Sequence, residues 1–426
     1  LNKIKYISTN NSYGSFNTWK NNIQFGSGLL GKNFTIDGRV SRISSDGYID
    51  RAKSNLRSFY LSTAFVTKKN SLRFNIFSGK EKTYQAWNGV AANLLQTDRT
   101  HNPSGTEKPG APYDNEVDDY TQTHYQLFYN HKFNKYWKGN VAVFLTRGKG
   151  YYEQYKANKK LADYNLPDYL DGNDTIKRTD IVRRLWLDNY FYGTIFSLQY
   201  QKNKTQLIFG GGYNAYEGKH YGKLKWAAVQ AAVPQGYRWY DLTAYKKDFT
   251  VYNKWIQQWG ANWQGFADLQ FRNIHYTING FRDNPSMQVR EDYNFLNPKL
   301  GFTYINKGWQ VYASYALATK EPNRDDYETG TAQLPKAERL HDFEIGVEKK
   351  TGRYFYAANI YYMNYKNQLV LTGKINDVGA YARINIPKSY RTGIELQGNL
   401  KINKWVNASA NITFSQNKIK NFTEYL

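Results

Sequence analysis

The residues best suited to chemistry in this sequence are aromatic and cationic side chains in its long polar stretches. Arginine and lysine attract negative charge, and planar rings stack on flat ligand groups. Together they predict recognition of an anionic, partly aromatic ligand by segments that connect regular elements. The candidate residues are Tyr84, Trp87, Tyr151, Tyr152, His220, Tyr221, Trp226, Arg238, Trp239, Tyr240, Arg282 and Arg324.

Other reactive chemistry is sparse. Cysteine is absent, which excludes disulfides, thiol catalysis and cysteine-ligated metal sites. No two histidines have the i, i+4 spacing of a helical zinc site, so we predict no metal centre. The histidines are His101, His124, His131, His220, His275 and His341. For His220 an ordinary solvated loop histidine is the favoured alternative. We find no nucleophile elbow or paired-carboxylate pattern, and we expect neither an enzyme nor a bound cofactor.

Two further patterns have plain structural interpretations. The glycine run 209–213 lacks the Lys-Ser/Thr of a phosphate-binding loop and continues as a strand. It therefore predicts a bulge or a close approach between strands. Asp325 and Asp326 adjoin and could hold a cation, but we expect a solvated turn there.

Alternating apolar and polar residues define the elements that must position the candidates. In 394–402 the apolar residues alternate with Glu395, Gln397, Asn399 and Lys401. The same period of two recurs in 72–77, 309–317 and 406–414. A period of two with one apolar face is typical of a half-buried strand. The sequence therefore predicts an all-β protein.

The connections between these strands alternate in length. Short basic turns such as 67–70 and 349–352 join strands into pairs, and long polar segments such as 151–184 and 216–247 separate the pairs. Outer-membrane barrels combine short periplasmic turns with long extracellular loops. A sandwich or propeller has no reason to place every short connection at one end. The aromatic residues near strand ends fit the interface girdles of a membrane barrel: Tyr304, Trp309, Tyr354, Tyr362 and Trp405.

Counting the alternating segments gives about 17 strands, one of which is predicted at 250–271. Bacterial single-chain barrels have an even number of strands, so we expect further strands after residue 426. The first residues lack the apolar core of a signal peptide, so either the protein is cytoplasmic or the start is mature or trimmed, and we favour the trimmed start. Several strands exceed the length needed to cross a bilayer and should project beyond the membrane. The prediction is a transmembrane antiparallel β-barrel that is incomplete at its C-terminus.

The composition limits the classes of partner that the protein is expected to bind. The net charge of +23 favours an anionic partner, and together with 17% aromatic residues it would also suit nucleic-acid binding. The cations are spread over turns and loops, however, and no RNA- or DNA-binding motif is present, so we expect no nucleic acid. A mean hydropathy of −0.75 and the lack of any long apolar run exclude transmembrane helices.

Motifs spread along the chain resemble the TonB-dependent outer-membrane receptors. Residues 312–327, followed by 334–338 and 343–346, look like the late barrel of that family, where a strand ends in a Lys/Arg-x-Pro loop and the next begins with Pro…Glu…Glu-x-Gly. Residues 390–395 are similar to the Arg-x-Gly-Ile-Glu strand start of the family. Two early segments, 44–50 and 79–88, look like loops at the start of its barrel.

The resemblance implies a 22-stranded barrel in the outer membrane of a Gram-negative bacterium, closed by an N-terminal plug. Residues 1–426 would be the barrel domain without the plug, the TonB box and the last strands. The implied function is uptake of a scarce, bulky nutrient, most often a ferric siderophore or another iron complex such as haem. The TonB complex would act through a plug that this chain does not contain. Outer-membrane lipid and lipopolysaccharide would surround the barrel.

Several alternatives stay open at this point. A passive porin-like barrel or an adhesin would share the strand pattern, and a TonB-dependent receptor could instead take up cobalamin or an oligosaccharide. Each candidate residue taken singly could also serve loop packing or contact with lipopolysaccharide.

Overall fold

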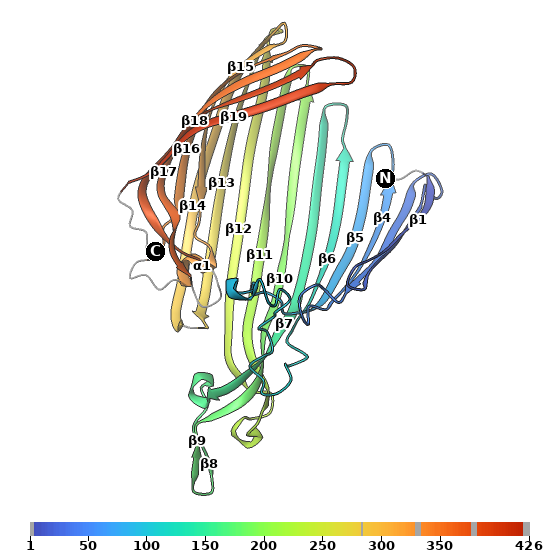
Figure 1. Ribbon diagram of the computed structural model, residues 1–426. Coiled ribbons are helices and arrows are strands. Elements are labelled where there is room, and N and C mark those ends of the chain that lie inside the picture. Colours follow the sequence, from blue (N-terminus) through green and yellow to red (C-terminus); the bar gives the residue numbers. More distant parts are fainter. Residues whose placement is uncertain (1–3, 283, 329–333, 376–380, 421–426) are drawn as a thin grey trace.

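One large antiparallel sheet makes up most of the computed structural model, which describes residues 4–282, 284–328, 334–375 and 381–420 (Figure 1). The sheet has 17 strands, in agreement with the sequence prediction. The elements are β1 Lys5–Gly14, β2 Thr18–Ser27, β3 Phe34–Ser45, β4 Ser54–Val66, β5 Asn70–Tyr84, β6 Val117–Lys132, β7 Trp137–Lys160, β8 Tyr169–Asp171, β9 Asp174–Ile176, β10 Arg178–Lys202, β11 Thr205–Ala227, β12 Arg238–Trp259, β13 Trp263–Phe281, β14 Asn284–Asn306, β15 Trp309–Lys320, α1 Arg324–Glu328, β16 Glu338–Lys350, β17 Tyr354–Ile375, β18 Tyr381–Lys401 and β19 Asn407–Ile419.

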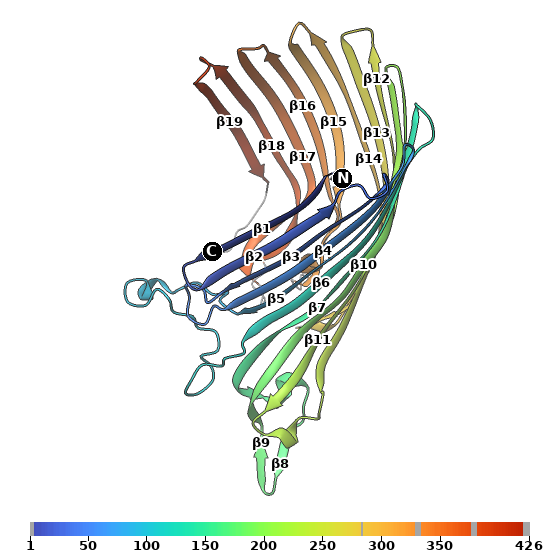
Figure 2. The same ribbon diagram turned by 90° about the vertical axis from the view of Figure 1, so that its right-hand side faces the viewer.

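Each strand of the large sheet pairs with the next one along the chain. The exception is β7, which pairs with β10, because β8 and β9 form a small hairpin of their own. Among the described residues no pairing joins β1 to β19, so the sheet is a curved wall with two edges (Figure 2). None of the helices in the described part of the chain has the length and hydropathy of a membrane-spanning segment.

The prediction of one continuous strand at 250–271 is wrong. The structure ends β12 at Trp259, begins β13 at Trp263, and places a tight turn between them. Gly260 supplies the positive φ of +59° that this turn requires. This turn, Gly260-Ala261-Asn262, contains no lysine and lies between two tryptophans, so the basic residues that mark turns such as 67–70 and 349–352 are missing.

The long polar segments are mostly strand and not loop, which corrects the sequence prediction. Within 216–247, only residues 228–237 form a connection, because β11 and β12 extend far from their tight turns. Within 151–184, the connection between β7 and β10 is likewise limited to 161–177. It includes the β8–β9 hairpin at the lower end of Figure 1. Polarity alternates only where one face is apolar. Where both faces meet water, the hydrogen-bond ladder continues without that pattern.

The position of α1 identifies the concave face of the sheet. Tyr327 of α1 packs with Ile278 and Phe281 of β13, and Asp326 lies 3.3 Å from Arg383 of β18. A helix of one turn reaches both strands only across the inside of the curve. The concave face is therefore the one that holds the inward residues of β13, and His220 of β11 shares it.

The opposite, convex face carries the apolar set. Phe65, Leu72, Tyr129 and Val141 lie directly opposite one another on β4, β5, β6 and β7, and all four are exposed. The neighbouring row on the concave face includes Asn75, whose amide nitrogen lies 3.3 Å from Gln126 Oε1. Exposed apolar residues outside and polar residues inside are the arrangement of a membrane barrel wall.

The glycine run 209–213 shows the predicted close approach without a bulge. It lies in regular β11, and a Cβ on Gly211 would come within 2.3 Å of the Thr250 carbonyl oxygen. The ring of Tyr252 occupies the space beside Gly210 in the same way. Glycine is therefore needed here for packing between strands.

Candidate functional site

Arginine and tyrosine side chains gather on the concave face, on the strand extensions opposite the tight turns. Tyr152 on β7, His220 on β11 and Tyr240 on β12 share this face with Arg183 of β10. Arg324 of α1 joins them, since its Nη1 lies 3.1 Å from His220 Nδ1. We call Tyr152, Arg183, His220, Tyr240, Arg282 and Arg324 the inner cluster. His220 is thus a strand residue on the wall and not the loop histidine that was favoured.

Two guanidinium groups of the inner cluster have only neutral partners. Arg183 donates to Gln154 Oε1, at 2.8 Å from Nη2 and 3.2 Å from Nε, and to Tyr164 Oη at 3.2 Å. Arg324 contacts His220 and lies 5.2 Å from the centroid of the Phe281 ring. Among the described residues no carboxylate is within ion-pair distance of Arg183 or Arg324, although both are half-buried. Such a site favours a negatively charged ligand.

The histidine and the two tyrosines of the inner cluster stay neutral at pH 7. Burial, and to a smaller extent the charge of Arg324, lowers the pKa of His220 to about 4. Burial raises the pKa values of Tyr152 and Tyr240, although Arg183 and Arg282 act in the opposite direction. At neutral pH the two phenols are therefore hydroxyl donors beside cations. The cluster can bind anionic oxygens through both charge and hydrogen bonds.

The segment that carries Arg324 is fixed to the concave wall at several points. Glu321 accepts from Lys246 Nζ at 2.6 Å and lies 3.4 Å from Arg272, and both partners are on the wall. Tyr327 is 1% exposed, and its Oη lies 2.7 Å from Tyr293 Oη. These contacts hold α1 against the strands and so position Arg324.

The solvated turn predicted at Asp325 and Asp326 is wrong for one of the two residues. Asp326 is 2% exposed, accepts from the Asn323 backbone N–H at 2.7 Å, and pairs with Arg383. Asp325 is exposed as predicted. The buried carboxylate is part of the α1 anchor.

Another group of candidate residues lies on the convex face and is separate from the inner cluster. Tyr151, Trp186 and Tyr221 form a row across β7, β10 and β11, with ring centroids 4.6 Å and 5.7 Å apart. Arg184 lies over Tyr151 and Arg238 over Tyr221, each 4.1 Å from the ring centroid. The structure thus places Tyr151, Tyr221 and Arg238 together, but on the opposite side of the wall from Tyr152 and Tyr240.

The remaining candidates have other surroundings. Tyr84 is buried and donates to the Tyr113 carbonyl oxygen at 2.5 Å, within the β5–β6 connection. Trp226 stacks on Tyr155 at 6.3 Å. Trp239 is buried and covers Gly222, behind Tyr240. Trp87 is 57% exposed and lies 5.4 Å from Tyr152, at the edge of the inner cluster.

Arg183 was missed by the sequence reasoning. It stands in a stretch interpreted as loop, beside Arg184, and nothing in the sequence distinguishes the two. The structure separates them because neighbouring strand residues point to opposite faces. Extending the predicted strand 187–200 toward the N-terminus would have placed Arg183 and Arg184 on opposite faces, without showing which face is concave.

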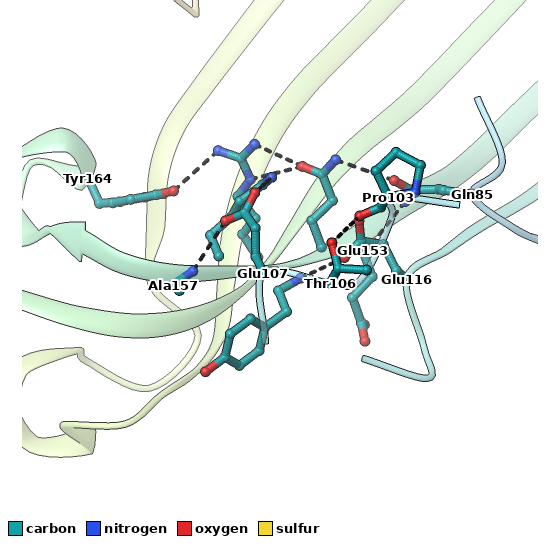
Figure 3. A network of polar contacts seen from close by, with 12 residues as sticks. Gln85, Pro103, Thr106, Glu107, Glu116, Glu153, Ala157 and Tyr164 are labelled. Carbon is teal, nitrogen blue, oxygen red and sulfur yellow. Dashed lines mark hydrogen bonds and ion pairs between the residues drawn. The ribbon is translucent and has the colours of Figure 1, made fainter. Parts of the chain in front are cut away.

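A buried carboxylate ties the β5–β6 connection to the wall (Figure 3). The side chain of Glu153 on β7 has no exposed surface and accepts from Tyr113 Oη at 2.5 Å, Asn115 Nδ2 at 2.6 Å and Arg184 Nε at 2.5 Å. Gln85 donates to the Glu153 carbonyl oxygen at 2.9 Å. Glu107 adds an ion pair with Lys156.

Replacing Glu153 with glutamine should loosen the connection 85–116. Burial acts to raise the pKa of Glu153, but hydrogen bonds from Tyr113, Asn115 and Arg184 outweigh it and lower that pKa. We expect a loss of about 1.5–3 kcal/mol of local stability, as for hydrogen bonds to a charged group. Hydrogen exchange across 85–116 measures it, and unchanged exchange rates would contradict this role.

The same carboxylate predicts a pH dependence. Because its pKa is lowered in the folded protein, its contribution is complete above the ordinary value of 4.5 and is lost as the pH falls further, through the lowered pKa. Protection of 85–116 against exchange, taken relative to unstructured peptide at the same pH, should therefore fall below about pH 4.5 in the wild type, whereas it should be low at every pH in the Glu153→Gln variant.

Comparisons with known proteins agree with this architecture. A family model described as TonB dependent receptor-like, beta-barrel matches residues 64–425. A search of curated protein sequences gives no match.

Solved structures share the fold at low identity. The ferric-catecholate import receptor Fiu from Escherichia coli K12 in its closed form is 16% identical, with a TM-score of 0.65 over 98% of this chain and 65% of that one. The copper transporter OprC is 10% identical, with a TM-score of 0.72 over 99% and 62%. The ferripyoverdine receptor of Pseudomonas aeruginosa, bound to ferripyoverdine, is 13% identical, with a TM-score of 0.70 over 100% and 57%. This chain therefore spans less than two thirds of the length of these three proteins.

Proposed function

This chain belongs to the family of TonB-dependent receptors, outer-membrane receptors and transporters rather than enzymes, and we propose that its barrel captures an anionic iron chelate for uptake. The substrate class of the proposal is a ferric siderophore or another iron complex such as haem. The inner cluster is the proposed binding surface, with Trp87 at its edge.

The observation that carries this proposal is a pair of half-buried arginines for which the described part of the chain provides no carboxylate partner. Arg183 and Arg324 would each gain a charge-assisted hydrogen bond from an anionic chelate oxygen. The hydroxyls of Tyr152 and Tyr240 stand beside them as further donors, and the exposed ring of Trp87 offers a stacking surface. A neutral sugar would leave both guanidinium charges uncompensated.

The rest of the proposal follows from the family. The barrel would lie in the outer membrane of a Gram-negative bacterium, with the apolar convex face in lipid and in contact with lipopolysaccharide. Residues 1–426 would act as the barrel domain. Energy from the TonB complex would enter through a plug and a TonB box, which these residues do not supply. Named functions of similar structures, such as ferric-catecholate import, support the substrate class.

Ligand titration of the receptor purified from outer membranes tests this function. We expect saturable quenching of tryptophan fluorescence by a ferric catecholate, a ferric hydroxamate or haem, and no saturable quenching by a neutral oligosaccharide. Capture should weaken between 50 and 500 mM salt, because exposed charges are screened over about 10 Å at 0.1 M salt. Saturable binding of cobalamin or an oligosaccharide alone would contradict the substrate class, and no saturable binding would favour a passive barrel.

A further inference from the structure

Lysines gather in one hollow at the tight-turn end of the wall, far from the inner cluster. The hollow has a volume of about 300 Å³, and its lining includes Lys68, Lys69, Lys132 and Lys138. Lys68 and Lys69 belong to the turn between β4 and β5, Lys132 ends β6, and Lys138 lies at the start of β7. The Lys132 backbone N–H donates to the Lys69 carbonyl oxygen at 2.8 Å, which holds this turn beside the end of β6. We call this site the lysine hollow.

The lysine hollow belongs to the concave face. Lys132 lies directly opposite Lys138. Each is an odd number of residues from a convex residue of its own strand, which is Tyr129 on β6 and Val141 on β7, so both side chains point to the concave side. Gln199 of β10 lies directly opposite Lys138 and also lines the hollow. The strands β7 and β10 therefore have cations on their concave face at both ends.

No negative charge compensates the lysine hollow. The residues that line it include no aspartate or glutamate. In the part of the chain that the structure describes, no carboxylate lies within ion-pair distance of any of its four lysines. Like charges directly opposite each other, as in Lys132 and Lys138, destabilise an antiparallel pair. An exposed group of ammonium ions without counter-charges favours a ligand with several anionic oxygens.

The concave wall between the two cationic sites is neutral on β7 and β10. Lys138 and Tyr152 lie about 45 Å apart along β7, from a rise of about 3.3 Å per residue. The concave residues of β10 between Arg183 and Gln199 are all uncharged. The same holds on β7 for the concave residues Asn140, Ala142, Phe144, Thr146, Gly148 and Gly150. An anion that leaves the inner cluster therefore meets no charged side chain of these two strands before it reaches the lysine hollow.

We propose that the lysine hollow is a second site for the anionic iron chelate, which occupies it on the way to the periplasm. The ammonium groups of Lys69, Lys132 and Lys138 would contact the anionic chelate oxygens. Lysine presents a strongly hydrated point charge on a flexible stem, so this site should bind more weakly than the arginine pair of the inner cluster. Passage through a pore requires sites that attract the ligand but also let it leave. The inference rests on the proposed function, because it concerns the same ligand.

Equilibrium dialysis of the full-length receptor against a radioiron-labelled ferric catecholate tests the proposal. We expect one tight and one weaker bound equivalent in the wild type. The variant Lys69→Gln with Lys132→Gln and Lys138→Gln should weaken the second equivalent by about tenfold or more, because charge-assisted hydrogen bonds to the ligand are lost. The affinity of the tight equivalent should change by less than about twofold, because exposed charges this far apart are screened from each other.

A matched control is Lys32→Gln with Lys202→Gln and Lys307→Gln, which removes the same charge from exposed residues at three other tight turns. It should keep both equivalents. The proposal is overturned if the control loses the weaker equivalent to the same extent, since overall charge would then explain the binding.

The stoichiometry separates this inference from the proposed function. A single tight equivalent in the wild type overturns the second site and leaves the proposed function standing, whereas no saturable binding overturns both. The variant Arg183→Gln with Arg324→Gln should lose the tight equivalent and keep the weaker one. Loss of both equivalents in that variant would contradict two independent sites.

Discussion

Replacing Arg183 and Arg324 together with glutamine is expected to weaken binding of an anionic iron chelate by about a hundredfold or more. Hydrogen bonds to charged groups contribute about 1.5–3 kcal/mol each, and 1.4 kcal/mol corresponds to a tenfold change in affinity. Among the residues that the structure describes, neither arginine has a carboxylate partner, so its replacement leaves none of their carboxylates buried without a counter-charge. The affinity change therefore reports contact with the ligand. Fluorescence titration with a ferric catecholate measures it.

The matched control is Arg178→Gln with Lys219→Gln, which removes equal charge from exposed residues of β10, the strand of Arg183, and of β11, the strand of His220 that contacts Arg324. Long-range attraction falls equally in both double variants, whereas direct contact is lost in only one. We expect the control to bind within about threefold of wild type. Equal losses in the two variants would show that overall charge, and not the inner cluster, governs capture.

Replacing Tyr327 with alanine is expected to release α1 from the concave wall. Tyr327 is 1% exposed and packs against Ile278, Phe281 and Val289, so its truncation should cost about 3–5 kcal/mol. The cost falls mainly on the docked segment, because the strand ladder beneath it keeps its own hydrogen bonds. Hydrogen exchange of 321–328 should rise steeply, while exchange in β13 and β14 should change little.

The conservative variant Tyr327→Phe separates the effect of ring packing from that of the hydroxyl hydrogen bond. It removes only the hydrogen bond with Tyr293, worth about 0.5–1.5 kcal/mol, and should leave the segment docked. Chelate affinity should fall in the alanine variant, because Arg324 loses its position, and should stay near wild type in the phenylalanine variant. Unchanged exchange of 321–328 in the alanine variant would contradict the anchoring role.

The sequence predicts the wall of this molecule well because alternation is imposed wherever one face is apolar. The segments 72–77 and 394–402 alternate for that reason, and both lie in strands of the sheet except for residue 402, which follows the end of β18. The prediction of a single strand failed at 259–263, because tryptophans on both sides of a short turn continue the aromatic pattern across it. It also failed in the strand extensions opposite the tight turns. Both faces of the sheet meet water there, so the alternating pattern is lost although the strands continue.

The candidate site could be predicted only as a set of residue types. Tyr151 and Tyr152 are neighbours in sequence, yet they belong to opposite faces, because a strand turns successive side chains to opposite sides. The partnership of His220 with Arg324 joins β11 to α1 and depends on how one segment folds inward. No local pattern encodes such a contact.

A structure of the receptor bound to a ferric chelate tests the central claim most directly. The account predicts the chelate on the concave face, with anionic oxygens within hydrogen-bonding distance of Arg183 and Arg324 and a hydroxyl of Tyr152 or Tyr240 beside them. A chelate bound away from these four residues, with both guanidinium groups still held only by Gln154, Tyr164 and His220, would contradict it.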